Sequence, residues 1–221
     1  MLDKFVPAPA RLVELGAAPG DQAASLAHLG YLVTAVDLGE APDAWAGSAS
    51  GRMEHIFDEA GVRYVEWDLA KTPYPLDNDE FDAVVMTEVF EHLREYPLQS
   101  LVECRRILRP GGRLFFTTPN AAYVLNRARA LKGLSTATSV DDWMYGVPYA
   151  RHAREYTFAE VQQMMSAAGF DVILAESRHL FKSAGKQTLG ARTAKQFLDR
   201  LAMMRNTLGP SIIIIAEKPA K

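Results

Sequence analysis

The stretch Val13-Glu14-Leu15-Gly16-Ala17-Ala18-Pro19-Gly20 decides the fold, because it joins an apolar strand to a helix through a glycine-containing turn. Residues 11–15 read as the strand and residues 21–29 as the helix. Glycines in such a turn let the backbone bend sharply and approach a ligand closely. In an open parallel sheet, ligands bind beyond the carboxyl ends of the strands. Taken alone, the turn is equally typical of a plain strand-to-helix connection.

Outward from this turn, short apolar runs alternate with helix-like segments, which is the pattern of βαβ units around a mostly parallel sheet. Residues 81–87 are nearly all apolar, as expected of a strand buried on both faces. The other strands are expected at 31–37, 62–67, 113–118, 170–176 and 211–217. The other helices are expected at 52–60, 97–108, 157–168 and, within an ambiguous segment, 193–204. The sequence therefore predicts a single α/β, Rossmann-like, doubly wound domain over residues 1–221.

Composition narrows the class of protein. The chain has 221 residues, of which 48% are hydrophobic, and a net charge of −3, which fits a soluble domain and disfavours a general nucleic-acid binder. Its one cysteine, Cys104, cannot form an internal disulfide, so we expect a reducing, cytoplasmic environment. Residues 1–15 lack the apolar segment of a signal peptide, and the apolar run 212–216 is too short to span a bilayer. An excess of arginine over lysine favours a bacterial source.

Two acidic residues follow neighbouring expected strands. Asp37 ends the strand 31–37, 21 residues after Gly16, where a carboxylate can accept hydrogen bonds from both ribose hydroxyls. Asp68 follows the next strand, where it can face an adenine edge. The turn has the spacing G-x-x-x-G, a poor match to the G-x-G-x-x-G fingerprint of dinucleotide sites. The spacing therefore favours a less anionic nucleoside cofactor.

These residues belong to six blocks of sequence that share an order and spacing with one family: Glu14-Leu15-Gly16 with Gly20, Val36-Asp37, Asp68-Leu69, Phe81-Asp82-Ala83-Val84-Val85, Leu108-Arg109-Pro110-Gly111-Gly112 and Leu114-Phe115-Phe116. The chain resembles class I S-adenosylmethionine-dependent methyltransferases, strongly over 10–120 and more loosely over 150–217. The resemblance implies a seven-stranded sheet in which the strand 211–217 is antiparallel and lies between strands 113–118 and 170–176. The sequence departs from the family at Ala18, where a glycine is usual, and at Pro19.

The resemblance also implies the cofactor and its contacts. The cofactor would be S-adenosylmethionine. Its candidate binding residues are Glu14, Gly16, Ala17, Ala18, Gly20, Asp37, Asp68, Leu69 and Glu88.

A group of acidic and histidine residues follows the strand 81–87. If a helical turn begins there, Glu88, Glu91 and His92 have the spacing i, i+3 and i+4 and share one face. Two carboxylates and an imidazole can hold a divalent cation such as Mg²⁺ or Mn²⁺, with His152 as a fourth ligand. Many methyltransferases carry such a turn without a metal. The candidate catalytic residues are His152, His92 and Glu91, and either histidine would be the base if no metal binds.

A second resemblance supports the metal. The turn at 88–92, the segment Thr117-Thr118-Pro119-Asn120 and the pair Arg151-His152 are similar to small-RNA 3′-terminal 2′-O-methyltransferases. In that family two glutamates and two histidines bind Mg²⁺, which grips a vicinal diol. The resemblance implies that Glu88, Glu91, His92 and His152 bind a divalent metal. The following Arg154-Glu155-Tyr156-Thr157 departs from that family, which counts against RNA more than against the metal.

Residues 120–150 interrupt the alternation of strands and helices, as an Ala-rich helix followed by a loop. Long insertions in compact domains are commonly functional. Aromatic rings in the insertion can stack on sugars or bases, and its acids can bind hydroxyls, although packing and plain exposure are the alternatives. We expect an acceptor-binding insertion, with these candidate residues: Asp141, Asp142, Trp143, Tyr145 and Tyr149.

The sequence therefore predicts an O-methyltransferase that transfers a methyl group to a hydroxyl of a saccharide or other polyol, assisted by a divalent metal. Bacterial sugar O-methyltransferases look similar in size and in the segment Arg-Glu-Tyr-Thr. Three alternatives stay open: an RNA 3′-end 2′-O-methyltransferase, a metal-free methyltransferase of a small metabolite, and a non-catalytic binder of the cofactor. Residues 180–209 are a candidate surface for a homodimer or a cover for the site. The arginines at 105, 106, 109 and 113 are expected to form a solvated face.

Overall fold

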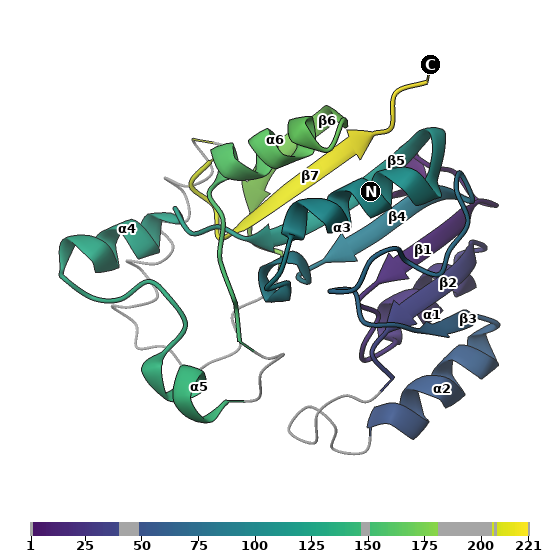
Figure 1. The fold of residues 1–221 in the computed structure, drawn as a ribbon, viewed down its shortest axis with the longest axis horizontal. Coiled ribbons are helices and arrows are strands. Elements are labelled where there is room, and N and C mark those ends of the chain that lie inside the picture. The colour runs from purple at the N-terminus through teal and green to yellow at the C-terminus, as the bar shows by residue number, and fades with distance from the viewer. Residues whose placement is uncertain (1, 40–48, 147–150, 181–204, 206, 221) are drawn as a thin grey trace.

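The computed structural model describes residues 2–39, 49–146, 151–180, 205 and 207–220. These residues form one seven-stranded sheet in the order β3-β2-β1-β4-β5-β7-β6 (Figure 1). The first five strands pair in parallel, and β7 is antiparallel to both β5 and β6. This topology confirms the expected doubly wound fold and the place of its antiparallel strand.

The strands are β1 (Arg11–Leu15), β2 (Leu32–Asp37), β3 (Arg63–Glu66), β4 (Phe81–Thr87), β5 (Leu108–Pro119), β6 (Asp171–Arg178) and β7 (Ser211–Glu217). The α-helices are α1 (Asp21–His28), α2 (Ala49–Ala60), α3 (Pro97–Ile107), α4 (Val124–Leu131), α5 (Val140–Tyr145) and α6 (Phe158–Ala167). Two short 3-10 helices are η1 (Leu2–Lys4) and η2 (Phe90–His92). None of the described helices is long and apolar enough to cross a membrane.

Two hydrophobic cores lie on opposite faces of the sheet, because successive strand residues point to opposite sides. In β4, for example, Val84 and Met86 belong to one core, and Ala83 and Val85 belong to the other. Helices α3 and α6 cover the first core, and α1 and α2 cover the second. The isoleucines of β7 are buried within the sheet, as expected of a strand with neighbours on both sides.

The excursion between β5 and α6 differs from the expected helix and loop. It contains a second helix, α5, which begins because Ser139 accepts a hydrogen bond from the Asp142 amide at 3.0 Å. Helices α4 and α5 lie beyond one end of the sheet (Figure 1). The helix expected over 193–204 and the candidate residue Tyr149 fall outside the described residues, so both stay predictions.

The turn after β1 lies directly against the turn after β4. Gly16 has φ +79°, and a Cβ atom built on it would overlap the Cγ2 methyl of Val89. Only glycine combines this left-handed backbone with this closeness. The contact joins the glycine turn to the segment that carries the acidic and histidine residues.

We expect Gly16→Ala to destabilise the protein by at least about 2 kcal/mol, because it adds both a steric overlap and a backbone strain. Gly61 is the matched control: its φ is +68° and nothing lies within 4 Å of a built Cβ, so Gly61→Ala should cost only about 1 kcal/mol of strain. Chemical denaturation measures both costs.

The double variant Gly16→Ala with Val89→Ala separates the two contributions at Gly16. It should recover the part of the loss that comes from the overlap, but not the backbone strain. Equal costs for Gly16→Ala and Gly61→Ala would contradict the proposed importance of this contact.

Candidate functional site

The candidate site lies at the carboxyl ends of the parallel strands. The strand order reverses between β1 and β4, since the chain builds β2 and β3 on one side before it returns to β4. A crevice at such a point is the usual ligand site of an open α/β sheet. The turns after β1 and β4 face each other there, through the contact of Gly16 with Val89.

The glycine turn and Asp37 form one rigid unit. The Asp37 carboxylate accepts hydrogen bonds from the backbone amides of Ala18 and Leu38, at 2.8 and 2.7 Å. The Gly20 amide donates to the Ala17 carbonyl at 2.7 Å, and Gly20 has φ +102° where α1 begins. A carboxylate oxygen can accept more than one hydrogen bond, so Asp37 keeps capacity for a ligand. The expected neighbourhood of Gly16, Ala17, Ala18, Gly20 and Asp37 is therefore present.

Glu14 is a buried carboxyl group beside this unit. It is 2% exposed, and its Oε2 atom has no hydrogen-bond partner among the described residues. Burial, together with the nearby charge of Asp37, raises the pKa of Glu14 to about 8. Ionising a carboxyl group that is buried in this way costs free energy, because the charge is removed from water. A cationic group placed next to Glu14 would offset that free-energy cost.

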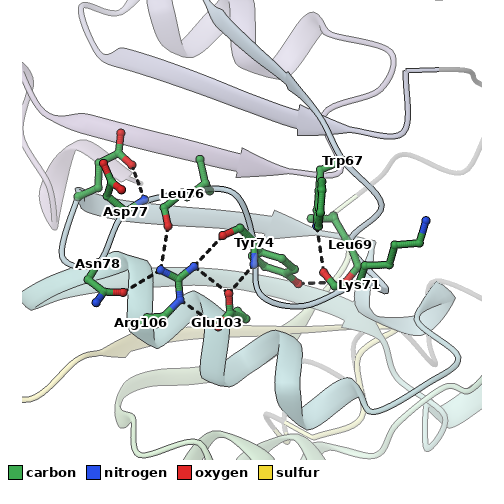
Figure 2. Close-up of polar contacts among 10 residues, drawn as sticks. Trp67, Leu69, Lys71, Tyr74, Leu76, Asp77, Asn78, Glu103 and Arg106 are labelled. Carbon is green, nitrogen blue, oxygen red and sulfur yellow. Dashed lines mark hydrogen bonds and ion pairs between the residues drawn. The ribbon is translucent and has the colours of Figure 1, made fainter.

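The segment after β3 carries Asp68 and Leu69 and is fastened to α3. The Tyr74 hydroxyl donates to the Leu69 carbonyl at 3.2 Å, and the Tyr74 amide donates to Glu103 at 2.6 Å (Figure 2). Asp68 closes its own turn by accepting a hydrogen bond from the Ala70 amide at 3.0 Å. These contacts hold the two candidate residues just beyond the carboxyl end of β3, the edge strand of the sheet.

Arg106 is central to this fastening, which corrects the expected solvated arginine face. Its guanidinium donates to the Tyr74 and Leu76 carbonyls at 2.9 and 2.8 Å, to the Asn78 side chain at 2.8 Å and to Glu103 at 2.8 Å (Figure 2). The pattern of charges in α3 could not reveal this role, because the partners outside the helix, Tyr74, Leu76 and Asn78, lie about 30 residues away in sequence.

Glu88 does not begin a helical turn, so the condition under which Glu88, Glu91 and His92 would share one helical face is not met. Glu88 has φ +55°, and the following short helix, η2, starts only at Phe90. Left-handed backbone conformations in residues other than glycine cluster at functional sites. The Glu88 carboxylate accepts a hydrogen bond from the Thr117 hydroxyl at 2.8 Å.

Glu91, His92 and His152 come together in space. One ligand atom of each lies within 4.8 Å of the others, so the three side chains could hold a metal ion. The rings of His92 and His152 meet edge to face, with centroids 5.0 Å apart. Glu88 is outside this group of three, although its charge acts on both Glu91 and His152.

The electrostatics of the group favour an added positive charge. Burial, and then the neighbouring charge of Glu88, raises the pKa of Glu91 to about 7. Burial also raises the pKa of Glu88, and it lowers the pKa of His92. The pKa of His152 is raised, first of all by its hydrogen bond to Glu155. A divalent cation would offset the cost of burying two ionised carboxylates.

His152 is placed by backbone contacts that cross the site. The Glu91 carbonyl accepts hydrogen bonds from the amides of Ala153 and Arg154, at 2.7 and 3.2 Å. Asn120, at the end of β5, forms an isolated bridge with Tyr156, and the Ala121 amide donates to the Tyr156 carbonyl at 3.0 Å. The segment 151–156 is therefore fixed to η2 on one side and to β5 on the other.

A cavity of about 500 Å³ opens beside His152. It lies between the α5 region and the segment 152–155, and its lining includes Thr136, Thr138, Trp143, His152 and Glu155. A neighbouring hollow of about 310 Å³ shares His152 and Glu155 and adds Asp142. Among the other candidates of the insertion, Tyr145 is 80% exposed, and neither hollow has Tyr145 or Asp141 in its lining.

Sequence reasoning assigned no role to three polar residues of this site. The Thr118 hydroxyl donates to Glu91 at 3.0 Å, as Thr117 donates to Glu88, so two adjacent strand residues orient the two carboxylates. Glu155 bonds to His152 at 2.9 Å. The position of Thr117 and Thr118 at the end of a strand next to β4 was the available signal. Nothing local distinguishes Glu155.

Comparison with known proteins identifies the family. A family model described as a methyltransferase domain matches residues 1–175. The ubiquinone biosynthesis O-methyltransferase of Xanthomonas oryzae pv. oryzae is 36% identical over 122 residues, which cover 53% of this chain and 48% of that protein. A Mycolicibacterium smegmatis protein named "Probable S-adenosylmethionine-dependent methyltransferase" is 30% identical over 181 residues, which cover 82% of this chain and 59% of that protein. The chain thus spans about half the length of the relatives it matches.

A solved structure gives the same result for the fold. The S-adenosylmethionine-dependent methyltransferase of Methanosarcina mazei has a TM-score of 0.66 at 15% identity, covering 100% of this chain and 97% of that one. At that identity the likeness concerns the fold alone. The matched family model and the fold confirm the resemblance to class I methyltransferases, and the chain belongs to the methyltransferase domain family.

Proposed function

We propose that this chain is an S-adenosylmethionine-dependent O-methyltransferase whose acceptor is a saccharide or other polyol, assisted by a divalent metal. The observation that carries the proposal is the meeting of Glu91, His92 and His152 after β4, where the strand order reverses, with an open cavity next to His152. One side of this arrangement suits a nucleoside cofactor, and the other suits an acceptor hydroxyl.

The residues around the glycine turn fit the cofactor. S-adenosylmethionine supplies a methyl group activated by a sulfonium and carries a positively charged ammonium. Glu14, whose Oε2 atom has no partner among the residues that the structure describes, can provide the negative charge for such a ligand, and Asp37 can accept hydrogen bonds from ribose hydroxyls. Asp68 and Leu69, held by the Tyr74 contacts, would border the base.

The cavity beside His152 fits a polyol. It combines a tryptophan ring with threonine hydroxyls and a carboxylate, and an aromatic face with a few convergent polar groups is suited to a sugar ring. His152 lies at the boundary between this cavity and the acid–histidine group. There it can orient an acceptor hydroxyl or remove its proton, which is the main task left to the protein when the methyl donor is already activated.

Glu91, His92 and His152 would hold the metal, and Glu88, whose charge acts on Glu91, is a candidate for an additional carboxylate ligand. This donor set, one or two carboxylates and two imidazoles, suits Mn²⁺ and other first-row divalent ions and also admits Mg²⁺. The cation would supply Lewis-acid activation of a hydroxyl and would favour acceptors with two adjacent oxygens. A histidine that binds the metal cannot also be the base, so the two roles exclude each other at one residue.

An aromatic diol is the second candidate acceptor. The matched protein of Xanthomonas oryzae pv. oryzae is named for ubiquinone biosynthesis, and a catechol shares adjacent oxygens with a sugar diol. An RNA end is disfavoured by the net charge of −3.

The acceptor class is tested by incubating the full chain with S-adenosylmethionine, Mn²⁺ or Mg²⁺, and one of three acceptors: methyl mannoside, 3,4-dihydroxybenzoate or a short RNA. Formation of S-adenosylhomocysteine is measured by mass spectrometry. We expect methylation of the sugar, a loss of rate with EDTA and recovery when metal is restored. Methylation of only the benzoate would show that the acceptor is an aromatic diol and not a saccharide. Full activity in EDTA without bound metal would contradict the proposed role of a divalent metal.

Cofactor binding is tested separately by calorimetry with S-adenosylhomocysteine. Asp37→Asn should weaken binding by roughly tenfold or more, because it removes a charge-assisted acceptor. Asp21→Asn, on the exposed first turn of α1, is the control and should bind like the parent. The absence of any binding heat in the parent protein would overturn the proposed activity altogether.

Glu14 predicts how cofactor binding depends on pH. With its pKa raised to about 8, Glu14 is mostly protonated at pH 7 before the cofactor binds. A cationic cofactor lowers that pKa, so binding at pH 7 should release up to about one proton and should tighten as the pH rises towards 8. Calorimetry in buffers of different ionisation enthalpy measures the release. Glu14→Gln should abolish it, and proton uptake in the parent would refute the assignment.

The acceptor cavity generates a paired prediction on α5. Trp143→Ala should raise the KM for the acceptor by roughly fivefold through the loss of a stacking surface, with little change in the KM for S-adenosylmethionine. Tyr145→Ala, on the same helix but exposed and away from the cavity lining, should change neither value. Equal effects of the two substitutions would rule out this location for the acceptor.

A further inference from the structure

We propose that Glu155 is a positioning residue that fixes the tautomer and orientation of His152, so that the Nε2 atom of His152 is the one presented to the site. The use of this orientation in metal binding or catalysis rests on the proposed function. The orientation itself follows from the contacts of the two histidine rings.

The contact itself defines which ring nitrogen carries the hydrogen. The Nδ1 atom of His152 lies 2.9 Å from Oε1 of Glu155. An ionised carboxylate can only accept, so Nδ1 of the neutral ring is the donor and Nε2 keeps its lone pair. A histidine that serves as a ligand or base is commonly oriented in this way by a carboxylate or a backbone carbonyl.

His92 is arranged in the same sense, through a different partner. Its Nδ1 atom lies 3.3 Å from the Arg151 carbonyl oxygen, which can only accept. Its Nε2 atom lies 4.0 Å from Oε1 of Glu91, on the side of the three-residue group. Both histidines therefore have Nδ1 engaged by an acceptor outside the group, which leaves Nε2 of each ring available to the same ligand or proton.

Glu155 does not have the contacts of a structural acid. Among the described residues, the Glu155 carboxylate bonds to His152, and Glu155 also lines the cavity beside His152. Glu160, five residues later, shows the contrast. It closes the capping box of α6 by accepting from the Thr157 amide at 2.7 Å and pairs with Arg154.

The tautomer of His152 is measured directly by long-range ¹H–¹⁵N correlation NMR of the full chain, at a pH where both site histidines are neutral. We expect the parent protein to show the Nδ1–H tautomer at His152. Glu155→Ala should shift the ring towards the Nε2–H tautomer. Glu155→Gln keeps an acceptor oxygen, so it should keep the Nδ1–H form. An Nε2–H tautomer in the parent, or an unchanged Nδ1–H tautomer in Glu155→Ala, would overturn the proposal.

Two matched variants separate positioning from general effects. Glu160→Ala removes a structural acid of the same segment and should lower stability without changing the tautomer of His152. Glu59→Ala removes the carboxylate of the exposed pair His55–Glu59, whose atoms lie 3.6 Å apart, and should change neither stability nor the site. A tautomer change at His152 in Glu160→Ala would show that local folding, and not the Glu155 contact, sets it.

The functional consequence is measured with Mn²⁺ alone and then with the methylation assay. Glu155→Ala should weaken Mn²⁺ binding, or lower kcat, by about 10- to 100-fold, with the KM for S-adenosylmethionine within about twofold of the parent. Glu155→Gln should recover most of the loss. If the parent binds no Mn²⁺ and methylates nothing, the proposed function fails while the NMR result still decides the role of Glu155. If the parent is active and Glu155→Ala is equally active, the inference fails alone.

Discussion

The close approach of Gly16 to Val89 is the constraint on which the site depends. It sets the turn after β1 against the turn after β4, at the place where the order of the strands reverses. Glu14, in β1, and Asp37, at the end of β2, lie beside the glycine turn. The segment after β4 carries Glu88, Glu91 and His92. A side chain at position 16 would separate the two turns, and a donor bound on one side would no longer face an acceptor on the other.

Buried polar groups make up much of this site, and the protein satisfies most of them with neutral donors. Thr117 and Thr118 donate to the two carboxylates, and backbone amides donate to Asp37. Hydroxyls and amides orient the carboxylates without neutralising their charge, so a bound cation would still be stabilised by the site. Glu14 is the extreme case, because one of its oxygens has no partner among the described residues. Such an arrangement lowers the stability of the ligand-free protein and reserves the compensating interaction for a bound cation.

The fold was predictable from the sequence because its signals are local. Apolar runs, the glycine turn and the acids at the strand ends each depend on a few neighbouring residues, and the resemblance supplied the antiparallel strand. The site was predictable only in part. The resemblance brought His152 together with Glu91 and His92, but no local pattern indicates that Glu88 takes a left-handed backbone. The contacts of Arg106 with residues 74–78 and the bond from Glu155 to His152 depend on the folded structure and leave no local pattern in the sequence. The short helix α5 depends on a single N-cap hydrogen bond to Ser139, which the helix propensity of a few residues does not reveal.

The bridge between Asn120 and Tyr156 has a consequence for how this protein can evolve. The excursion that carries α4 and α5 leaves the sheet at Asn120 and returns at Tyr156, and its two ends are bonded to each other, with the Ala121 amide donating to the Tyr156 carbonyl at 3.0 Å. The closure is made by backbone atoms of Asn120, Ala121 and Tyr156. Residues 124–146, which lie between these two ends, can therefore be exchanged as a unit; under the proposed function, such an exchange would alter the choice of acceptor while the glycine turn and Asp37 stay intact.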